Sequence, residues 1–404
     1  MATESTIQSA FLREREDGAS SAGAGAAARR LRVLIVAPSL DYLGGQAIQA
    51  RRLLARFAEE PSLEAAFIPI NPRLPGVFGK LQKIKYVRTI VTSLRYWAML
   101  LNRVRRYDII HIFSASYWSF VLAPTPAILV AKLYGKRAVL NYRSGQAEKH
   151  LRLWRRTALP TIRLVDRIVV PSGYLVDVFA RFDLRAESIF NFVDMSSFRF
   201  RCRAPLKPVF LSNRNHEPLY NVGCILRAFA IIQQRIMAAR LIVAGDGSQR
   251  PALEALARSL GLRNVEFIGR VAPERMPELY DAADIYLNSP NIDNMPGSII
   301  EAYASGLPVV TTEAGGIPYI VTHGETGLLV RCDDHEAMAA RALSLLEDHD
   351  MAQRLIARAR DECRKYEWQA VRNEWLKFYN RLAPELAETQ TQLASGSAQA
   401  SAGK

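Results

Sequence analysis

Two carboxylates stand eight residues apart in the stretch 291–312, where residue types and spacing point most clearly to chemistry. Asp293 falls in a predicted loop. Glu301 falls inside a helix that Pro296 should open, because proline is favoured at the first helical position. A loop carboxylate can accept hydrogen bonds from sugar hydroxyls, and one further along the helix can reach a ribose. The alternative is that Asp293 or Asn294 only caps the helix.

The first turn of that predicted helix suits a phosphate. Its leading backbone N–H groups have no partner inside the helix, and the helix dipole is positive at this end. A glycine at this point lets a ligand approach the backbone closely. The residues concerned are Gly297, Ser298 and Ile299. They predict an anion site beside the two carboxylates.

Alternating strands and helices should position this segment. Apolar runs typical of strands buried on both faces alternate with helical stretches, and this order predicts parallel, doubly wound sheets. The predicted strands are 31–38, 66–70, 109–113, 138–142 and 167–171, and after a restart 208–212, 240–244, 265–268, 285–288 and 308–312. Ligands of such sheets bind beyond the carboxyl ends of the strands.

The restart predicts an α/β protein with two Rossmann-like, doubly wound domains that face an interdomain cleft. The segment 192–207 is the expected linker. The predicted divisions are a disordered tail (1–29), an N-terminal domain (30–195), a C-terminal domain (206–364), a helix that packs back on the N-terminal domain (366–383) and a second disordered tail (388–404).

The composition is that of an ordinary globular chain. Of 404 residues, 49% are apolar and 23% are charged, which excludes a wholly disordered protein and a collagen. The four cysteines form no C-x-x-C pair, so a disulfide scaffold or zinc ribbon is not expected, and a reducing compartment fits. The histidines lack metal-ligand spacing, and no metal site is predicted, including at Asp348 and Asp350.

The net charge of +14 is concentrated in one region. Residues 72–170 hold 19 Lys and Arg against three acidic residues, so the rest of the chain is nearly neutral. Aromatic and apolar residues lie between the basic ones, which favours an anionic membrane surface. Nucleic acid is the second possibility and a merely solvated basic face the third; no nucleic-acid partner is predicted.

Two segments bear on whether the chain enters or crosses a membrane. The first 29 residues contain no apolar run after a basic start, so a secretory signal is not predicted. Residues 112–131 carry no charge over about the length of a bilayer span. Because this segment contains Pro124, Pro126 and four Ser or Thr residues, a strand end, a loop and a buried helix are the preferred interpretation.

The motif around Asp293 resembles the donor site of retaining glycosyltransferases of family 4, which have the two-domain GT-B fold. Their pattern is E-x7-E followed by A-x-G-x-P-V-V, and this sequence has Asp293-x7-Glu301 and then Ala-Ser-Gly-Leu-Pro-Val-Val at 304–310. The resemblance is strong over about residues 208–350 and looser over 31–200. Further matching motifs lie at 245–247, 267–269, 280–284, 315–318 and 324–330.

The resemblance implies a role for each matching residue. Asp293 would bind the hydroxyls of the transferred sugar and Glu301 the ribose, while the helix start holds the diphosphate. Arg270 and Val271 would face the base. Additional donor-binding positions are Gly245 and, in the N-terminal domain, Gly44 and Gly45, where phosphate, acceptor contact or packing alone are the alternatives.

The sequence departs from the family pattern at three positions. The first acid is Asp rather than the commoner Glu, and its reach is one methylene shorter. Of the family's Arg and Lys on the diphosphate, Arg214 is present, but Tyr220-Asn221 stands where Lys-Gly is expected. Where the N-terminal domain often carries a His, the sequence has Arg143, which could replace the lost cation or indicate altered activity.

The expected function is retaining, metal-independent transfer of a sugar from a nucleotide sugar, with UDP-sugar the expected donor and no separate cofactor. Asp293, Arg214, Glu301 and Arg143 are the expected catalytic residues. The acceptor, a lipid-linked molecule or glycan of the cell envelope, would bind the N-terminal domain at the cytoplasmic face of the membrane. The alternatives are a nucleotide-sugar epimerase of the same fold, a non-catalytic scaffold and, third, a nicotinamide dehydrogenase, which the missing glycine-rich fingerprint disfavours.

Overall fold

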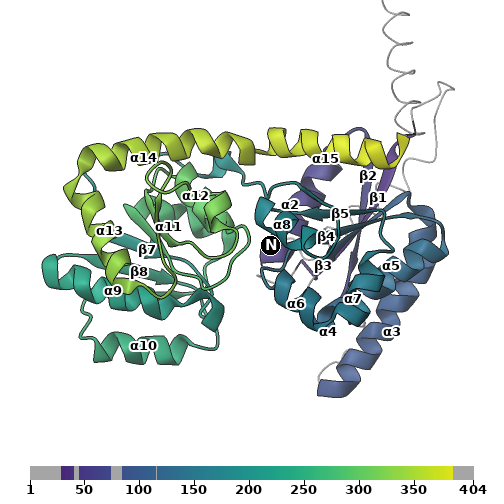
Figure 1. The fold of residues 1–404 in the computed structure, drawn as a ribbon, viewed down its shortest axis with the longest axis horizontal. Coiled ribbons are helices and arrows are strands. Elements are labelled where there is room, and N and C mark those ends of the chain that lie inside the picture. Colours follow the sequence, from purple (N-terminus) through teal and green to yellow (C-terminus); the bar gives the residue numbers. More distant parts are fainter. Residues whose placement is uncertain (1–28, 41–44, 74–83, 115, 385–404) are drawn as a thin grey trace, which may run out of the picture. The chain divides into compact units, whose positions relative to one another are not determined.

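Two six-stranded sheets form the framework of the chain (Figure 1). The computed structural model describes residues 29–40, 45–73, 84–114 and 116–384. Apart from Arg29, the two predicted tails lie outside these ranges, as do the candidate Gly44 and the basic residues Lys80 and Lys83. The predicted fold class, with two separate doubly wound sheets, is confirmed.

The first sheet has the order β2-β1-β3-β4-β5-β6, and the strands from β2 to β5 run parallel. Every residue of β3 is buried, because helices cover both faces of a parallel sheet. Strand β6 was not predicted, since three half-exposed residues give no apolar run. The strands are β1 (Leu31–Ala37), β2 (Leu63–Pro69), β3 (Ile109–Ser114), β4 (Arg137–Tyr142), β5 (Arg167–Val170) and β6 (Ala186–Ser188).

The second sheet has the order β12-β11-β10-β7-β8-β9, with all neighbours parallel. Its alternate residues enter two different cores: Ile285 and Leu287 pack on one face of β10 and Tyr286 on the other. The short strand β12 was also missed from the sequence. The strands are β7 (Val209–Ser212), β8 (Arg240–Ala244), β9 (Val265–Gly269), β10 (Ile285–Asn288), β11 (Val309–Thr312) and β12 (Leu328–Val330).

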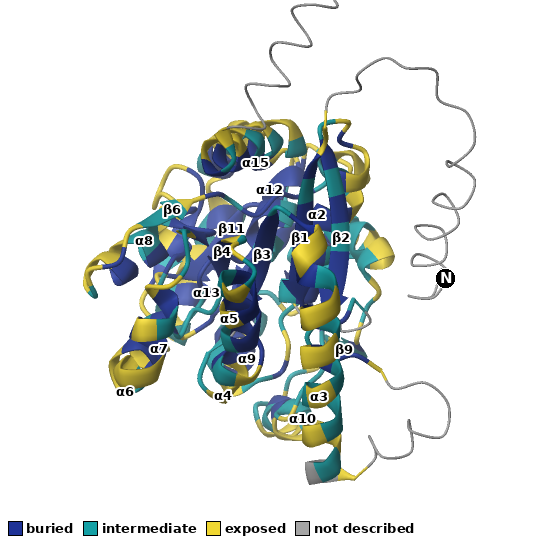
Figure 2. Ribbon diagram, turned by 90° about the vertical axis from the view of Figure 1, so that its right-hand side faces the viewer, coloured by how far each residue is buried: buried dark blue, intermediate teal, exposed yellow. Residues whose placement is uncertain are grey.

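Helices connect the strands, and their buried faces line the sheets (Figure 2). Asp348, one of the two acids weighed for metal binding, caps α14 instead: its carboxylate accepts a hydrogen bond from the N–H of Met351 at 2.8 Å. The helices are α2 (Gly45–Ala58), α3 (Lys85–Arg103), α4 (Trp118–Leu122), α5 (Pro124–Leu133), α6 (Ala147–Leu153), α7 (Arg155–Ile162), α8 (Gly173–Ala180), α9 (Val222–Arg235), α10 (Arg250–Ser259), α11 (Met276–Ala282), α12 (Gly297–Ala304), α13 (His335–Glu347), α14 (His349–Glu362) and α15 (Trp368–Leu382).

The uncharged segment 112–131 contains the end of β3 and the two short helices α4 and α5. Pro124 begins α5, where proline costs no hydrogen bond. Among the residues that the structure describes, no helix has the length and apolar character needed to cross a bilayer.

The chain divides into two compact units that interleave along the sequence. Unit 1 comprises Met1–Arg143, His150–Val169 and Leu376–Lys404, and unit 2 comprises Ser144–Lys149 and Val170–Trp375. The last turns of α15 therefore belong to unit 1. These divisions differ from the predicted ones chiefly in assigning residues 170–195 to unit 2.

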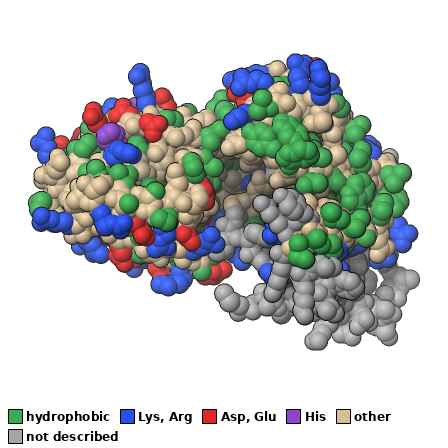
Figure 3. All heavy atoms as spheres, turned by 90° about the horizontal axis from the view of Figure 1, so that it is seen from below, with side chains coloured by type: hydrophobic (Ala, Val, Ile, Leu, Met, Phe, Trp, Pro, Cys, Tyr) green, Lys and Arg blue, Asp and Glu red, His purple; other side chains and the backbone are tan. Residues whose placement is uncertain are grey.

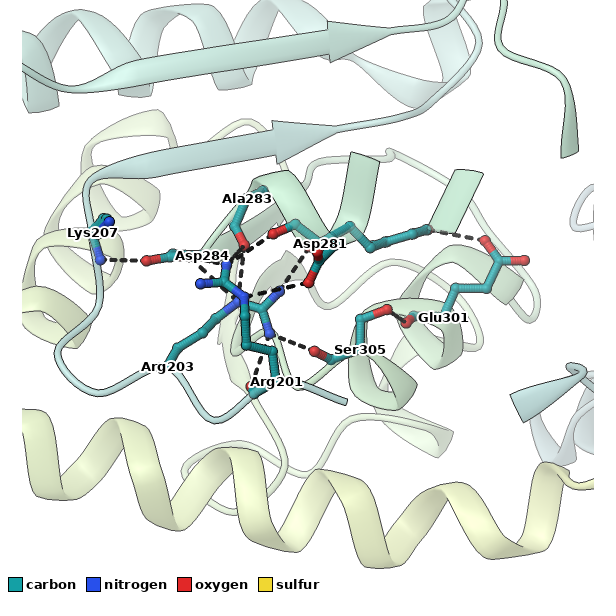
Figure 4. Close-up of polar contacts among 9 residues, drawn as sticks. Arg201, Arg203, Lys207, Asp281, Ala283, Asp284, Glu301 and Ser305 are labelled. Atoms are coloured by element: carbon teal, nitrogen blue, oxygen red, sulfur yellow. Dashed lines mark hydrogen bonds and ion pairs between the residues drawn. The ribbon is translucent and has the colours of Figure 1, made fainter. Parts of the chain in front are cut away.

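The buried Arg203, just before the second sheet begins, forms hydrogen bonds to the ends of helices α11 and α12 (Figure 4). The Arg203 side chain is fully buried and donates to the carbonyl oxygens of Tyr280, at 2.8 Å, Ala283, at 2.9 Å, and Ser305. Its Nε lies 3.5 Å from Asp284, which Arg201 also contacts at 2.6 Å. These bonds join the carboxyl ends of α11 and α12.

Burial, and then the neighbouring Arg201, lower the pKa of Arg203 to about 10, so the group stays charged at neutral pH. The Arg203→Ala variant should lose at least about 3 kcal/mol of stability, because buried carbonyl groups lose a charged donor. Exposed Arg199 provides the control, and Arg199→Ala should stay within about 0.5 kcal/mol of the parent. Urea unfolding followed by circular dichroism measures both. Equal midpoints for the two variants would contradict this role.

Candidate active site

Helix α12 carries Glu301 and the three residues predicted to bind a phosphate, Gly297, Ser298 and Ile299. Pro296 is its N-cap rather than its first helical residue, and the cap has no side-chain hydrogen bond. The N–H of Ile299 is already used, since it donates to the Pro296 carbonyl at 3.2 Å. Within the described ranges, no acceptor pairs with the N–H groups of Gly297 and Ser298. These two donors therefore remain available at the positive end of the helix dipole.

Arg214 lies at this helix start and joins two other predicted residues. One guanidinium nitrogen, Nη2, forms an ion pair with Asp293, and the other, Nη1, donates to Ser298 Oγ at 3.1 Å. The guanidinium lies 4.3 Å above the Tyr220 ring. Burial opposes the charge, but Asp293 and the nearby tyrosines outweigh it and raise the pKa of Arg214. Tyr220, which stands in the expected lysine position, thus packs against Arg214.

Glu301 is held by a tyrosine that sequence reasoning did not assign to the site. The Tyr280 hydroxyl lies 3.0 Å from Glu301 Oε2 and 3.1 Å from the Ser298 carbonyl. Asn213 donates to that hydroxyl at 2.6 Å and accepts from Tyr286 at 2.7 Å. Burial, and then Glu301, raise the pKa of Tyr280 far above its usual range, so it remains a neutral donor. The tyrosine fixes the direction of the Glu301 carboxylate.

Two glycines let backbone segments meet beside Arg214 and Asp293. Gly245 has φ +131°, and a Cβ at this position would overlap the Arg214 carbonyl. Gly315, with φ +54°, would in the same way overlap the Asp293 carbonyl, to which Gly316 N–H donates at 2.9 Å. The structure therefore supplies a packing reason for Gly245, which the sequence assigned to donor binding.

The predicted base-binding loop follows β9. Gly269, the last residue of β9, accepts a hydrogen bond from Gly245 N–H at 2.7 Å, which joins the loops after β8 and β9. The exposed Arg270 has Nε 3.4 Å from Asp246, and Val271 follows it. Nearby His216 is fully buried, and neither ring nitrogen has a hydrogen-bond partner within the described part of the chain. Sequence reasoning found no role for this histidine.

The N-terminal candidates lie in unit 1. Gly45 begins α2, and Gln46 donates to the Ser114 carbonyl at 3.1 Å. Arg143 follows β4 and donates to Asn141 Oδ1 at 3.3 Å. His111 is fully buried on β3 and hydrogen-bonded to the side chains of Asn141 and Tyr379.

The site can therefore present an arginine, two backbone N–H groups and two carboxylates to one ligand. Such a set matches the charge and hydroxyl pattern of a nucleotide sugar. Across the described residues, no cluster of three or more His, Cys, Asp or Glu side chains is placed to hold a metal ion.

Comparisons with known proteins agree with this geometry. Residues 207–348 match the family model described as glycosyl transferases group 1. The chain is 25% identical to the sulfoquinovosyl transferase SQD2 of Arabidopsis thaliana over 86% of this chain and 73% of that protein. It is 22% identical to the phosphatidyl-myo-inositol mannosyltransferase of Mycobacterium leprae over 85% of this chain and 91% of that protein.

The fold has a solved counterpart. The crystal structure of Anabaena HepE in complex with UDP and glucose superimposes with a TM-score of 0.67 at 17% identity, covering 87% of this chain and 100% of that one. This likeness concerns the fold, while the family match falls on the segment that carries Arg214, Asp293 and Glu301. Residues 207–348 thus match the glycosyl transferases of group 1, and the chain has the GT-B fold.

Proposed function

We propose that the protein transfers a hexose from a UDP-sugar to an acceptor hydroxyl with retention of configuration. The observation that carries this proposal is the contact of Arg214 with Asp293 and Ser298 at the start of α12. In the free protein the arginine and the carboxylate neutralise each other. A bound donor would exchange this ion pair for two better-matched ones: diphosphate oxygens on Arg214, and sugar hydroxyls on Asp293.

The reaction breaks the bond between the anomeric carbon and the diphosphate oxygen, and the acceptor oxygen bonds to the same face of that carbon. The acceptor proton passes to the departing diphosphate, so no protein nucleophile and no metal ion are required. Arg214 and the N–H groups of Gly297 and Ser298 stabilise the charge that grows on the diphosphate. Glu301, oriented by Tyr280, accepts the ribose hydroxyls. Arg270 and Val271 contact the base.

The acceptor is proposed to be a lipid-linked or glycan hydroxyl used in cell-envelope synthesis. The relatives support a lipid acceptor: one is by name a phosphatidyl-myo-inositol mannosyltransferase and another a sulfoquinovosyl transferase. UDP as the nucleotide is supported by the complex of HepE with UDP and glucose. Unit 1, with Gly44, Gly45 and Arg143, would receive the acceptor.

The surface of unit 1 supports peripheral binding to the cytoplasmic face of an anionic membrane. Helix α3 has a second apolar stripe, separate from the face that buries Tyr96 and Leu100. The stripe residues recur at helical spacing and are 61%, 65%, 37% and 40% exposed: Ile90, Leu94, Trp97 and Leu101. Figure 2 shows much of α3 as exposed, and hydrophobic side chains gather on unit 1 with Lys and Arg at their margin (Figure 3). Apolar residues flanked by cations match a lipid surface better than water.

Replacing Arg214 or Glu301 by Ala should reduce turnover of UDP-sugar by about 10²–10³-fold, because a preorganised group aimed at the donor is lost. Arg235→Ala, on the exposed last turn of α9, is the matched control and should keep full activity. Turnover is measured by release of UDP from a panel of UDP-sugars with membrane lipid extract as acceptor. Near-normal turnover in both site variants would contradict the roles of Arg214 and Glu301. Binding of UDP-sugar without turnover by the parent protein would indicate a non-catalytic scaffold.

The membrane prediction is tested with a Leu94→Ser, Trp97→Ser double variant. Its binding to phosphatidylglycerol-containing vesicles should fall at least about tenfold, because two large apolar side chains lose their burial in lipid. Met237→Ser removes a comparably exposed apolar side chain from unit 2 and should bind like the parent. A further Arg105→Ser, Arg106→Ser change should weaken binding about fivefold per charge at low salt. Equal flotation of all variants with the vesicles would contradict the proposed surface.

A further inference from the structure

Arg143 is a cation that no carboxylate in the described part of the chain neutralises. Its guanidinium contacts Asn141 Oδ1 at 3.3 Å and the face of Phe113 at 5.3 Å, and no carboxylate of the described chain forms an ion pair with it. Burial lowers the pKa of Arg143 to about 9, which still leaves it protonated at neutral pH. A desolvated charge of this kind costs free energy unless an anion approaches it. Its environment is therefore suited to an anionic ligand.

Three neutral side chains continue from Arg143 into the core of unit 1. Asn141 Nδ2 lies 2.9 Å from His111 Nε2, and His111 Nδ1 lies 2.6 Å from the Tyr379 hydroxyl. Asn141 and His111 are on adjacent parallel strands, β4 and β3, and Tyr379 comes from α15, more than 200 residues later in the sequence. All three side chains are fully buried.

The donor and acceptor groups allow only one direction for the hydrogen bonds between Arg143, Asn141 and His111. Arginine has only donors, so Asn141 must present its oxygen to Arg143 and its NH₂ to the histidine. His111 Nε2 therefore accepts, and its proton lies on Nδ1, directed at the Tyr379 oxygen. Protonation of Nε2 would remove the acceptor that orients Asn141. Burial, and then the charge of Arg143, lower the pKa of His111 to about 3, so the neutral form persists at physiological pH.

We propose that Asn141, His111 and Tyr379 are positioning residues that hold the Arg143 guanidinium for a phosphate oxyanion of a substrate. The inference rests on the proposed glycosyl transfer, for which Arg143 is one of the expected catalytic residues. Such an oxyanion would be the counter-ion that no described carboxylate supplies to Arg143. Because α15 supplies Tyr379, this helix takes part in positioning Arg143.

Double-mutant cycles test whether Asn141 and Tyr379 act through Arg143. Arg143→Ala should lower kcat about 10²–10³-fold. Asn141→Leu should lower kcat about 10–100-fold by misplacing the guanidinium, and Tyr379→Phe should cause a smaller loss. Neither should lower kcat further in the Arg143→Ala background, since both act through Arg143. The KM for UDP-sugar should stay within about twofold, because residues of unit 2 hold the nucleotide.

Tyr96→Phe is the matched control, because it also removes a buried tyrosine hydroxyl from unit 1, one that donates to the Ala123 carbonyl at 2.9 Å. It should leave kcat unchanged. Additive losses in the cycle, or equal losses in Tyr96→Phe and Tyr379→Phe, would show a merely structural role and overturn the proposal.

An NMR readout separates this inference from the proposed function. ¹⁵N-histidine spectra of the full chain should show His111 as the Nδ1–H tautomer, and its pKa should rise in Arg143→Ala when the neighbouring charge is removed. If no UDP-sugar is turned over, the proposed reaction fails, and these spectra still decide the coupling. The proposed hydrogen-bond chain would be refuted if His111 were the Nε2–H tautomer, or if its pKa were unchanged in Arg143→Ala.

Discussion

The buried guanidinium of Arg203 is the interaction on which the geometry of unit 2 depends. It gathers carbonyl groups from the ends of α11 and α12, while Asp284 balances its charge. Those two helices carry Tyr280 and Glu301, whose hydrogen bond sets the direction of a carboxylate in the candidate donor site. A buried charge-assisted network thus holds the two helices whose side chains Tyr280 and Glu301 meet in the candidate donor site.

Close backbone contacts supply the second constraint. Around Arg214 and Asp293, the chain approaches itself so tightly that only glycine fits at Gly245 and Gly315. Side chains at the edge of a parallel sheet are usually carried on loops, and loops alone position them poorly. Here each loop is pressed against a neighbouring loop, and the two oppositely charged side chains meet at a defined point. Rigidity at the donor site comes from backbone packing as much as from side-chain bonds.

Much of the fold followed from the sequence because strands buried on both faces leave a clear apolar signal. The runs that became β1, β3 and β10 were recognised for this reason, whereas β6 and β12, at the sheet edges, were too short to register. The spacing from Asp293 to Glu301 was equally readable, since both residues belong to one local segment. Tyr280 and Asn213 were missed because their pairing spans 67 residues and depends on tertiary packing. The division of α15 between the two units, after Trp375, was not predicted either, because no local feature of the helix marks that point.

The position of α15 has a consequence for how the protein is made. Unit 1 is completed by residues after Trp375, so its hydrophobic core stays open while the whole of unit 2 is being synthesised. Phe378 and Tyr379, both buried, are translated only after the whole of unit 2. Unit 2 is continuous apart from one short segment and can fold first. The N-terminal unit, although translated earlier, is completed later, and an incomplete core of this kind leaves apolar surface exposed during the interval.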